Sequence, residues 1–116
     1  MSVEIYHNPR CSKSRQTLQL LEENGFEPSI TEYLKTPPDR AELEKILGML
    51  GMEPRDLMRR KEAEYKAAGL DNPDLTREQL IQGMIDHPKL IERPIVISNG
   101  KAVIGRPPEQ VLEILR

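Results

Sequence analysis

Two short apolar runs on either side of an Asn-Gly pair give the strongest constraint on how this chain folds. The segment PIVISNGKAVIG, residues 94–105, places Asn99-Gly100 between them. Asn-Gly is the preferred pair for a type I′ turn, in which both central residues have positive φ, and such a turn joins antiparallel strands. The sequence therefore predicts an antiparallel hairpin close to its end.

The first part of the chain has the pattern of a strand-helix-strand unit. Residues 2–7 alternate apolar and polar side chains, as a half-buried strand does, and residues 13–24 carry leucines in a helical pattern. Gly25 can take the left-handed conformation that ends a helix. Residues 29–34 then indicate a second, weaker strand. Strands joined through a helix in this way lie parallel.

A helical insert of about residues 39–88 separates these two parts. Asp39 and Glu42 have the spacing of a capping box, and apolar residues between 43 and 50 recur at the spacing of one helical stripe. Residues 54–68 predict one or two short polar helices. A further capped helix begins at Thr76 and stops at Pro88.

After the hairpin, Pro107 and Pro108 can open a last helix. The order of elements is then β-α-β, a helical insert, and β-β-α. With 116 residues the chain is long enough for one domain, residues 1–116. Four strands in this order predict an α/β thioredoxin-like fold, in which a four-stranded mixed sheet has helices on both faces.

Composition argues against several classes of function. A formal net charge of -2, with one Phe, three Tyr and no Trp, does not favour binding to nucleic acid. The apolar runs are far shorter than the roughly 20 residues that span a bilayer, and the start has no pattern of a signal peptide. His7 and His87 lie far apart, so no metal site is indicated. We expect a cytoplasmic protein that acts without nucleic acid or membrane.

The only cysteine, Cys11, lies in the stretch YHNPRCSKSR, between the first strand and the first helix. The amide N–H groups and the dipole of a helix N-terminus favour a thiolate over a thiol, and they can also bind an anion. Arg10, Lys13 and Arg15 add positive charge. We therefore expect a reactive nucleophile beside an oxyanion pocket. The alternative is a small buried cysteine that only fills space.

Three further arginines are candidates for binding that oxyanion. Arg93 precedes the first strand of the hairpin, Arg106 follows the second, and Arg59 lies in the insert. The planar guanidinium group donates hydrogen bonds in pairs, which suits a tetrahedral oxyanion. Taken singly, each of these arginines is more often a solvated surface charge.

Four segments together resemble the arsenate reductase family that works with glutathione and glutaredoxin. The resemblance extends from Ile5 to Leu115, and its segments are IYHNPRCSKSRQTL, LMRRKEAEYKAAGL, HPKLIERPIVI and GRPPEQVLEIL. It implies that Cys11 is the catalytic nucleophile and that His7 helps to lower the pKa of its thiol. It further implies that Arg59, Arg93 and Arg106 line the oxyanion site, and that a cis peptide precedes Pro94. Arg60, next to Arg59, is an alternative for the position in the insert.

The cysteine count limits the mechanism independently of the resemblance. Reduction of arsenate to arsenite takes two electrons, and this sequence contains one thiol. A second sulfur must come from outside, which fits glutathione as a co-substrate and glutaredoxin as the partner that clears a mixed disulfide from Cys11. We expect no bound metal or organic cofactor.

Two other functions stay open at this point. The same fold family includes a transcriptional regulator that binds RNA polymerase, which usually has a Cys-x-x-Cys pair where this chain has Cys11 and Ser14. A monothiol glutathione oxidoreductase, which exchanges thiols without any oxyanion, has the same Cys-x-x-Ser spacing.

Overall fold

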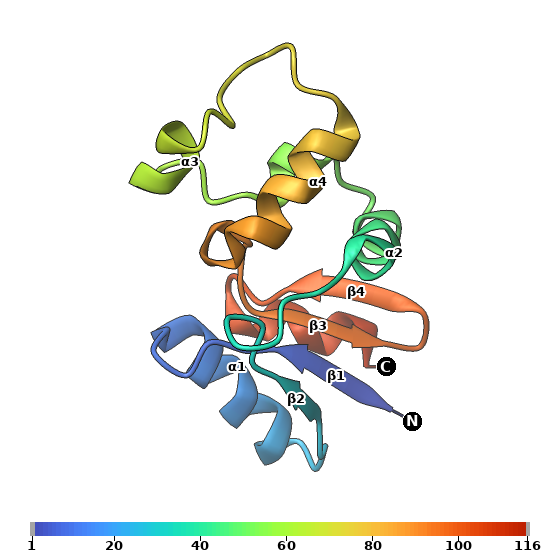
Figure 1. Ribbon diagram of the computed structural model, residues 1–116. Helices are drawn as coiled ribbons and strands as arrows, with labels where there is room; N and C mark the ends of the chain where they lie inside the picture. Colours follow the sequence, from blue (N-terminus) through green and yellow to red (C-terminus); the bar gives the residue numbers. More distant parts are fainter. Residues whose placement is uncertain (1, 116) are drawn as a thin grey trace. The chain divides into compact units, whose positions relative to one another are not determined.

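The computed structural model describes residues 2–115 (Figure 1). The chain divides into two compact units, one formed by the residues up to Thr36 together with those from Arg93 onward, the other by Pro37–Glu92. The first unit contains strands β1 (Val3–Tyr6), β2 (Ser29–Thr31), β3 (Ile95–Ser98) and β4 (Lys101–Ile104), helix α1 (Ser12–Glu23) and the 3-10 helix η3 (Pro108–Ile114).

The four strands form one mixed sheet in the order β2-β1-β3-β4 (Figure 1). β1 pairs with β2 in parallel and with β3 in antiparallel orientation, and β3 pairs with β4 in antiparallel orientation. The end of β1, the end of β2, the start of β3 and the end of β4 therefore lie at the same edge of the sheet. The segments that follow or precede these ends are brought together there.

The hairpin has the turn that its sequence predicts. Asn99 and Gly100 both have positive φ, at 56° and 72°, and Ser98 faces Lys101 across the turn. The predicted second strand, by contrast, ends early. The N–H groups of Lys35 and Thr36 both donate to the carbonyl oxygen of Glu32, and the resulting turn takes the chain away from the sheet after Thr31.

The core of the first unit lies on one face of the sheet, where α1 and η3 pack against it. Its buried members are apolar side chains of the sheet and of both helices. The last helix is a 3-10 helix, and its buried residues Pro108 and Val111 are three positions apart, which is the repeat of that helix. The core residues are Val3, Ile5, Leu21, Val96, Val111 and Leu115.

The second unit is helical. It consists of α2 (Arg40–Leu50), the 3-10 helix η1 (Pro54–Leu57), α3 (Ala63–Ala67), α4 (Arg77–Asp86) and the 3-10 helix η2 (Pro88–Leu90). The helical insert predicted at about residues 39–88 lies within this unit of Pro37–Glu92. None of the helices formed by residues 2–115 is long and apolar enough to cross a membrane.

Local sequence explains where the two longer helices of this unit begin. Asp39 caps α2 by accepting a hydrogen bond from the N–H of Glu42, and Thr76 and Gln79 form a complete capping box before α4. The side chains of Leu43, Ile46 and Leu47 are buried, as the predicted stripe requires. Within residues 54–68 the structure has two short helices, η1 and α3.

Candidate active site

Cys11 lies at the junction of β1 and α1. Its N–H donates to the carbonyl oxygen of Asn8 at 3.0 Å, which closes a tight turn, and its extended backbone (φ −93°, ψ 124°) makes it the N-cap residue of α1. The side chain is buried, with 8% of its surface exposed. The sulfur therefore lies where the first amide groups of the helix have no partners within the helix.

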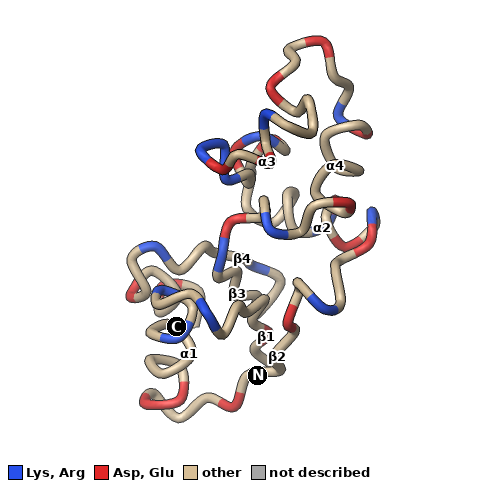
Figure 2. The backbone as a smooth tube through the Cα atoms, turned by 60° about the vertical axis from the view of Figure 1, so that its left-hand side comes forward, with Lys and Arg blue, Asp and Glu red and all other residues tan. Residues whose placement is uncertain are grey.

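The charges on α1 are reversed relative to the helix dipole. Its first turn contains no acidic residue and its last turn no basic one, while Glu22 and Glu23 lie at its end and Lys13 and Arg15 near its start (Figure 2). A helix is stabilised by the opposite arrangement, by about 0.3–1 kcal/mol for each charge. This arrangement does not stabilise the helix, but it does favour an anion at the start of α1.

Two arginines from the other end of the chain lie beside Cys11. Arg106 Nη2 is 3.9 Å from Cys11 Sγ, and Arg106 Nε donates to the carbonyl oxygen of Arg93 at 2.8 Å. The Nε and Nη1 groups of Arg93 are buried and have no hydrogen-bond partner among the described residues. The peptide between Arg93 and Pro94 is cis, as the resemblance implies, and so is the peptide that follows Arg106.

The pKa of the Cys11 thiol lies below its ordinary value. Burial opposes this by favouring the neutral thiol, but the backbone N–H of Ser14, the guanidinium group of Arg93 and the backbone N–H of Lys13 together outweigh it. The N–H groups of Ser14 and Lys13 lower this pKa without a capping hydrogen bond to the Cys11 side chain. The site thus favours a thiolate next to a guanidinium group whose N–H donors are not fully used.

His7 is connected to the Cys11 turn through Ser14. His7 Nδ1 and Ser14 Oγ are 2.6 Å apart and buried, and Ser14 Oγ also accepts a hydrogen bond from the N–H of Asn8 at 3.0 Å. Burial lowers the pKa of His7, with a smaller contribution from Arg15, and Glu32 opposes this. A neutral His7 can orient Ser14, whose amide acts on Cys11, so any effect of His7 on the thiol is indirect.

Gly105 allows the end of β4 to approach α1 closely. A Cβ atom at this position would lie 2.7 Å from Thr17 Oγ1 and 2.9 Å from Pro94 Cγ. The N–H of Gly105 donates to the carbonyl oxygen of Pro94 at 2.9 Å. Gly105 thus fixes the segment that leads into Arg106. No motif in the sequence marks Ser14 or Gly105 as a positioning residue. The contacts of Ser14 cross the turn between β1 and α1, and Gly105 contacts Thr17 from a segment far away in the chain.

Arg59 belongs to the second unit. Its Nη1 is 2.7 Å from Glu62 Oε1, and both side chains are about one-quarter exposed, whereas Arg60 is exposed. Glu62 Oε2 is also 4.0 Å from Lys89 Nζ. Within residues 2–115, no three His, Cys, Asp or Glu side chains are grouped so that they could hold a metal ion.

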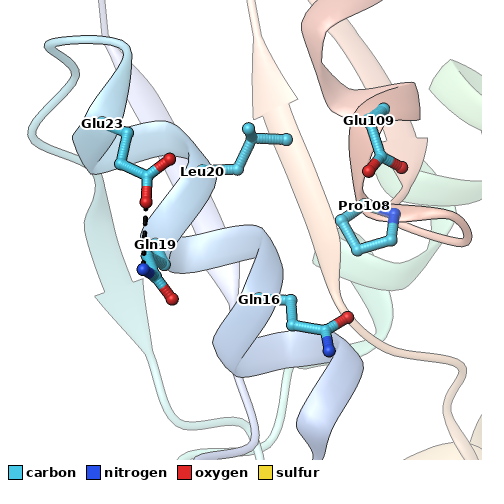
Figure 3. A pocket seen from close by; sticks show the side chains of 6 residues that line it. All are labelled: Gln16, Gln19, Leu20, Glu23, Pro108 and Glu109. Atoms are coloured by element: carbon cyan, nitrogen blue, oxygen red, sulfur yellow. Dashed lines mark hydrogen bonds between the residues drawn. The ribbon is translucent and has the colours of Figure 1, made fainter.

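A pocket of about 260 Å³ between α1 and η3 is distinct from the Cys11 site (Figure 3). Leu20 and Pro108 line it together with polar side chains, among which Glu23 and Glu109 are acidic. Two carboxylates would repel an oxyanion. This pocket is therefore not a second site for the anion that the start of α1 favours.

A thioredoxin-like α/β unit with a buried, activated cysteine and adjacent arginines defines a class of protein suited to thiol chemistry on an anion. Within that class the chain belongs to the ArsC family, whose model matches residues 6–114, which confirms the family seen in the sequence. The coupling to glutathione and glutaredoxin stays a prediction. The uncharacterized protein YfgD of Escherichia coli (strain K12) is 62% identical over 114 residues, which cover 97% of this chain and 96% of that protein.

Two further relatives carry the name of an enzyme. The arsenate reductase of Haemophilus influenzae is 53% identical over 116 residues, which cover 99% of this chain and 100% of the relative. The solved structure of the arsenate reductase from Vibrio cholerae has a TM-score of 0.96 and 55% sequence identity and covers 98% of each chain. The fold described above is thus the fold of this family.

Proposed function

We propose that this protein reduces arsenate to arsenite, with Cys11 as the nucleophile, glutathione as co-substrate and glutaredoxin as the partner that regenerates the thiol. The observation that carries the proposal is the pairing of a thiol of lowered pKa with the Arg93 guanidinium, whose buried Nε and Nη1 have no partner among the described residues. The thiolate supplies the nucleophile, and the free N–H donors fit the oxygens of a tetrahedral anion.

In the first step, the Cys11 thiolate attacks the arsenic atom of bound arsenate. An S–As bond forms, and one As–O bond breaks as its oxygen takes protons and leaves as water. Arg93 and Arg106 donate hydrogen bonds to the remaining oxygens and stabilise their negative charge during this step. Arsenic stays in the pentavalent state, because no electrons have yet been transferred to it.

In the second step, glutathione attacks this adduct. An S–S bond forms between glutathione and Cys11, and the S–As bond breaks with its electron pair left on arsenic, which is released as arsenite. The two sulfurs are oxidised to a disulfide while arsenic gains two electrons, so the step balances. Glutaredoxin then takes up the glutathione moiety by thiol-disulfide exchange and frees the Cys11 thiol.

The named relatives support the substrate in this proposal. The Haemophilus influenzae and Vibrio cholerae proteins, both more than half identical over nearly the full chain, are described as arsenate reductases. The proposal needs reduced glutathione, which is present in the cytoplasm, the compartment in which we expect the protein to act. It requires no bound metal or organic cofactor.

Two residues have secondary roles in the proposal. Arg59 adds a third guanidinium group to the oxyanion site, and this assignment comes from the family resemblance, not from the geometry of the first unit. His7 positions Ser14, whose amide lowers the pKa of the Cys11 thiol. The unpartnered donors of Arg93 favour this reaction over simple thiol exchange, which needs no group to bind an oxyanion.

A coupled assay tests the proposal. The protein is mixed with arsenate, glutathione, glutaredoxin, glutathione reductase and NADPH, and the oxidation of NADPH is followed. We expect oxidation that depends on arsenate and is absent with Cys11→Ser. The proposal fails if the rate with arsenate equals the rate without it, or if Cys11→Ser retains full activity.

A further inference from the structure

A cavity of about 270 Å³ lies against the turn that precedes Cys11. One wall is formed by residues 7–10 of that turn, and the other by Glu32, Leu34 and Lys35, which follow β2. The volume is slightly below the roughly 300–1,000 Å³ typical of small-molecule sites. The cavity can therefore hold part of a small flexible ligand and leave the rest outside.

The walls of the cavity carry a particular pattern of charge. Arg10 and Lys35 are cationic and exposed, and Glu32 supplies one carboxylate, whose Oε1 is 3.6 Å from Lys35 Nζ. Leu34 adds an apolar surface and is 42% exposed, which is unusual for a leucine of this chain. A complementary ligand would have two carboxylates, one ammonium group and a short apolar segment.

Glutathione has this set of groups. We propose that this cavity binds the tripeptide backbone of glutathione, with its two carboxylates near Arg10 and Lys35 and its ammonium group near Glu32. This inference rests on the proposed function only for the choice of glutathione as the thiol. The complementary charges and the cavity are properties of the chain itself.

The sheet topology brings this cavity and Arg93 to one edge of the sheet but on different sides of β1, the strand that leads to Cys11. β2 lies on one side of β1 and β3 on the other. The end of β1, the end of β2 and the start of β3 all lie at the same edge of the sheet. Glu32 and Lys35 follow β2, whereas Arg93 precedes β3. The two reactants can thus approach Cys11 from opposite sides without competing for the same cations.

The wall formed by residues 7–10, which directly precede Cys11, is held by hydrogen bonds. The N–H of Arg10 donates to Asn8 Oδ1 and the N–H of Asn8 to Ser14 Oγ, both at 3.0 Å, and Cys11 itself closes the turn through its N–H. A ligand anchored in the cavity therefore lies against a fixed turn that leads directly into the nucleophile. Its cysteinyl thiol, outside the cavity, can extend over the turn towards the sulfur of Cys11.

Binding is tested without any reaction by NMR titration of ¹⁵N-labelled Cys11→Ser with S-methylglutathione, which cannot form a disulfide. We expect amide shifts confined to residues 7–14 and 32–35, because the ligand lies in the cavity and its methylated sulfur extends over the turn at position 11, and we expect weaker binding in Cys11→Ser/Lys35→Gln. Lys101→Gln, in the same background, is the matched control, because Lys101 is an exposed lysine on β4. Shifts elsewhere, no shifts, or equal weakening by both substitutions would overturn the inference.

A kinetic measurement separates this inference from the proposed function. In the wild-type background, we expect Lys35→Gln to raise KM for glutathione about fivefold or more, since a charge-assisted contact is lost. The preference for glutathione over 2-mercaptoethanol, which has no carboxylates, should fall by the same factor. An unchanged preference overturns the glutathione site while arsenate reduction stands. If the wild type shows no arsenate-dependent turnover with either thiol, the proposed function fails and the NMR titration alone decides the site.

Discussion

Replacing Gly105 by alanine tests how closely the end of β4 must approach α1. The added methyl group would lie 2.7 Å from Thr17 Oγ1 and 2.9 Å from Pro94 Cγ, and Cβ atoms in proteins essentially never approach other atoms to less than 3.0 Å. Neither neighbour can move easily. The Thr17 hydroxyl donates to the carbonyl oxygen of Lys13 at 2.8 Å, and the Pro94 ring has no flexible end.

The expected cost follows from these contacts. Inserting a methyl group into a well-packed site lowers the free energy of unfolding by about 1–3 kcal/mol. Alanine also restricts the unfolded chain more than glycine does, which raises the free energy of unfolding by about 0.4–1 kcal/mol. The net loss is then about 1–2 kcal/mol. For a chain of this size, this corresponds to a fall in Tm of roughly 4–8 °C. Because Gly105 leads into Arg106, we also expect a higher KM for arsenate.

Thermal unfolding followed by circular dichroism, together with the coupled arsenate assay, measures both effects. Gly48→Ala is the matched control, because a Cβ at this position in α2 has no neighbour within 4 Å and alanine stabilises a helix by about 0.5–1 kcal/mol relative to glycine. We expect Gly48→Ala to raise Tm. Thr17→Ala combined with Gly105→Ala should recover part of the loss. A Tm for Gly105→Ala at or above that of the wild type would refute the reasoning.

Four further predictions concern the site and the cap of one helix. Arg93→Met should raise the pKa of Cys11, measured by the pH dependence of alkylation; an unchanged midpoint would show that this charge does not act on the thiol. The pKa of Cys11 is lower in the folded protein than in the unfolded chain, so the thiolate adds to the free energy of unfolding. Measured as the difference in free energy of unfolding between wild type and Cys11→Ser, this contribution should be largest at pH values above the ordinary thiol pKa. It should be lost as the pH falls through the lowered pKa of the folded protein. Arg93→Lys should raise KM for arsenate, because lysine keeps the charge but lacks the paired N–H donors of arginine. Arg59→Lys and Arg60→Lys, measured in the same assay, show which of these two residues binds the anion, since only that substitution should raise KM. Asp39→Ala should cost about 1 kcal/mol in urea unfolding, since it removes the cap of α2; no loss would mean that solvent replaces the cap.

Local signals were enough to predict most of the fold. Asn99-Gly100 specifies its turn through the φ values that the two residues adopt, and Asp39 and Thr76 mark the starts of α2 and α4 through their own hydrogen bonds. These features depend on residues only a few positions apart. Side-chain and backbone preferences over such short ranges can be read directly from sequence.

The features that sequence alone could not predict depend on contacts between distant segments. The backbone amides of α1 lower the pKa of Cys11, as the sequence predicts, but the cation that lowers it is Arg93 and not the neighbouring Arg10, Lys13 or Arg15. Arg93 reaches Cys11 because β3 pairs with β1. No spacing within either segment records that pairing.

The second strand shows the same limit on a smaller scale. Residues 29–34 have the pattern of a strand throughout, but β2 is an edge strand with a single neighbour, β1. The turn formed around Glu32 uses the backbone groups that a longer strand would have offered to the sheet. Where the strand ends is therefore decided by the turn, which also forms one wall of the cavity next to Cys11.

The identity of the reductant tests the central claim of a single-thiol mechanism most directly. Cys11 is the only cysteine in the sequence, so its oxidised form must be a mixed disulfide with a small thiol. We predict that intact mass spectrometry after incubation with arsenate and glutathione shows one glutathione bound to the wild type and none to Cys11→Ser, and that glutaredoxin restores the free thiol. Full turnover with thioredoxin in the absence of glutathione would contradict this account.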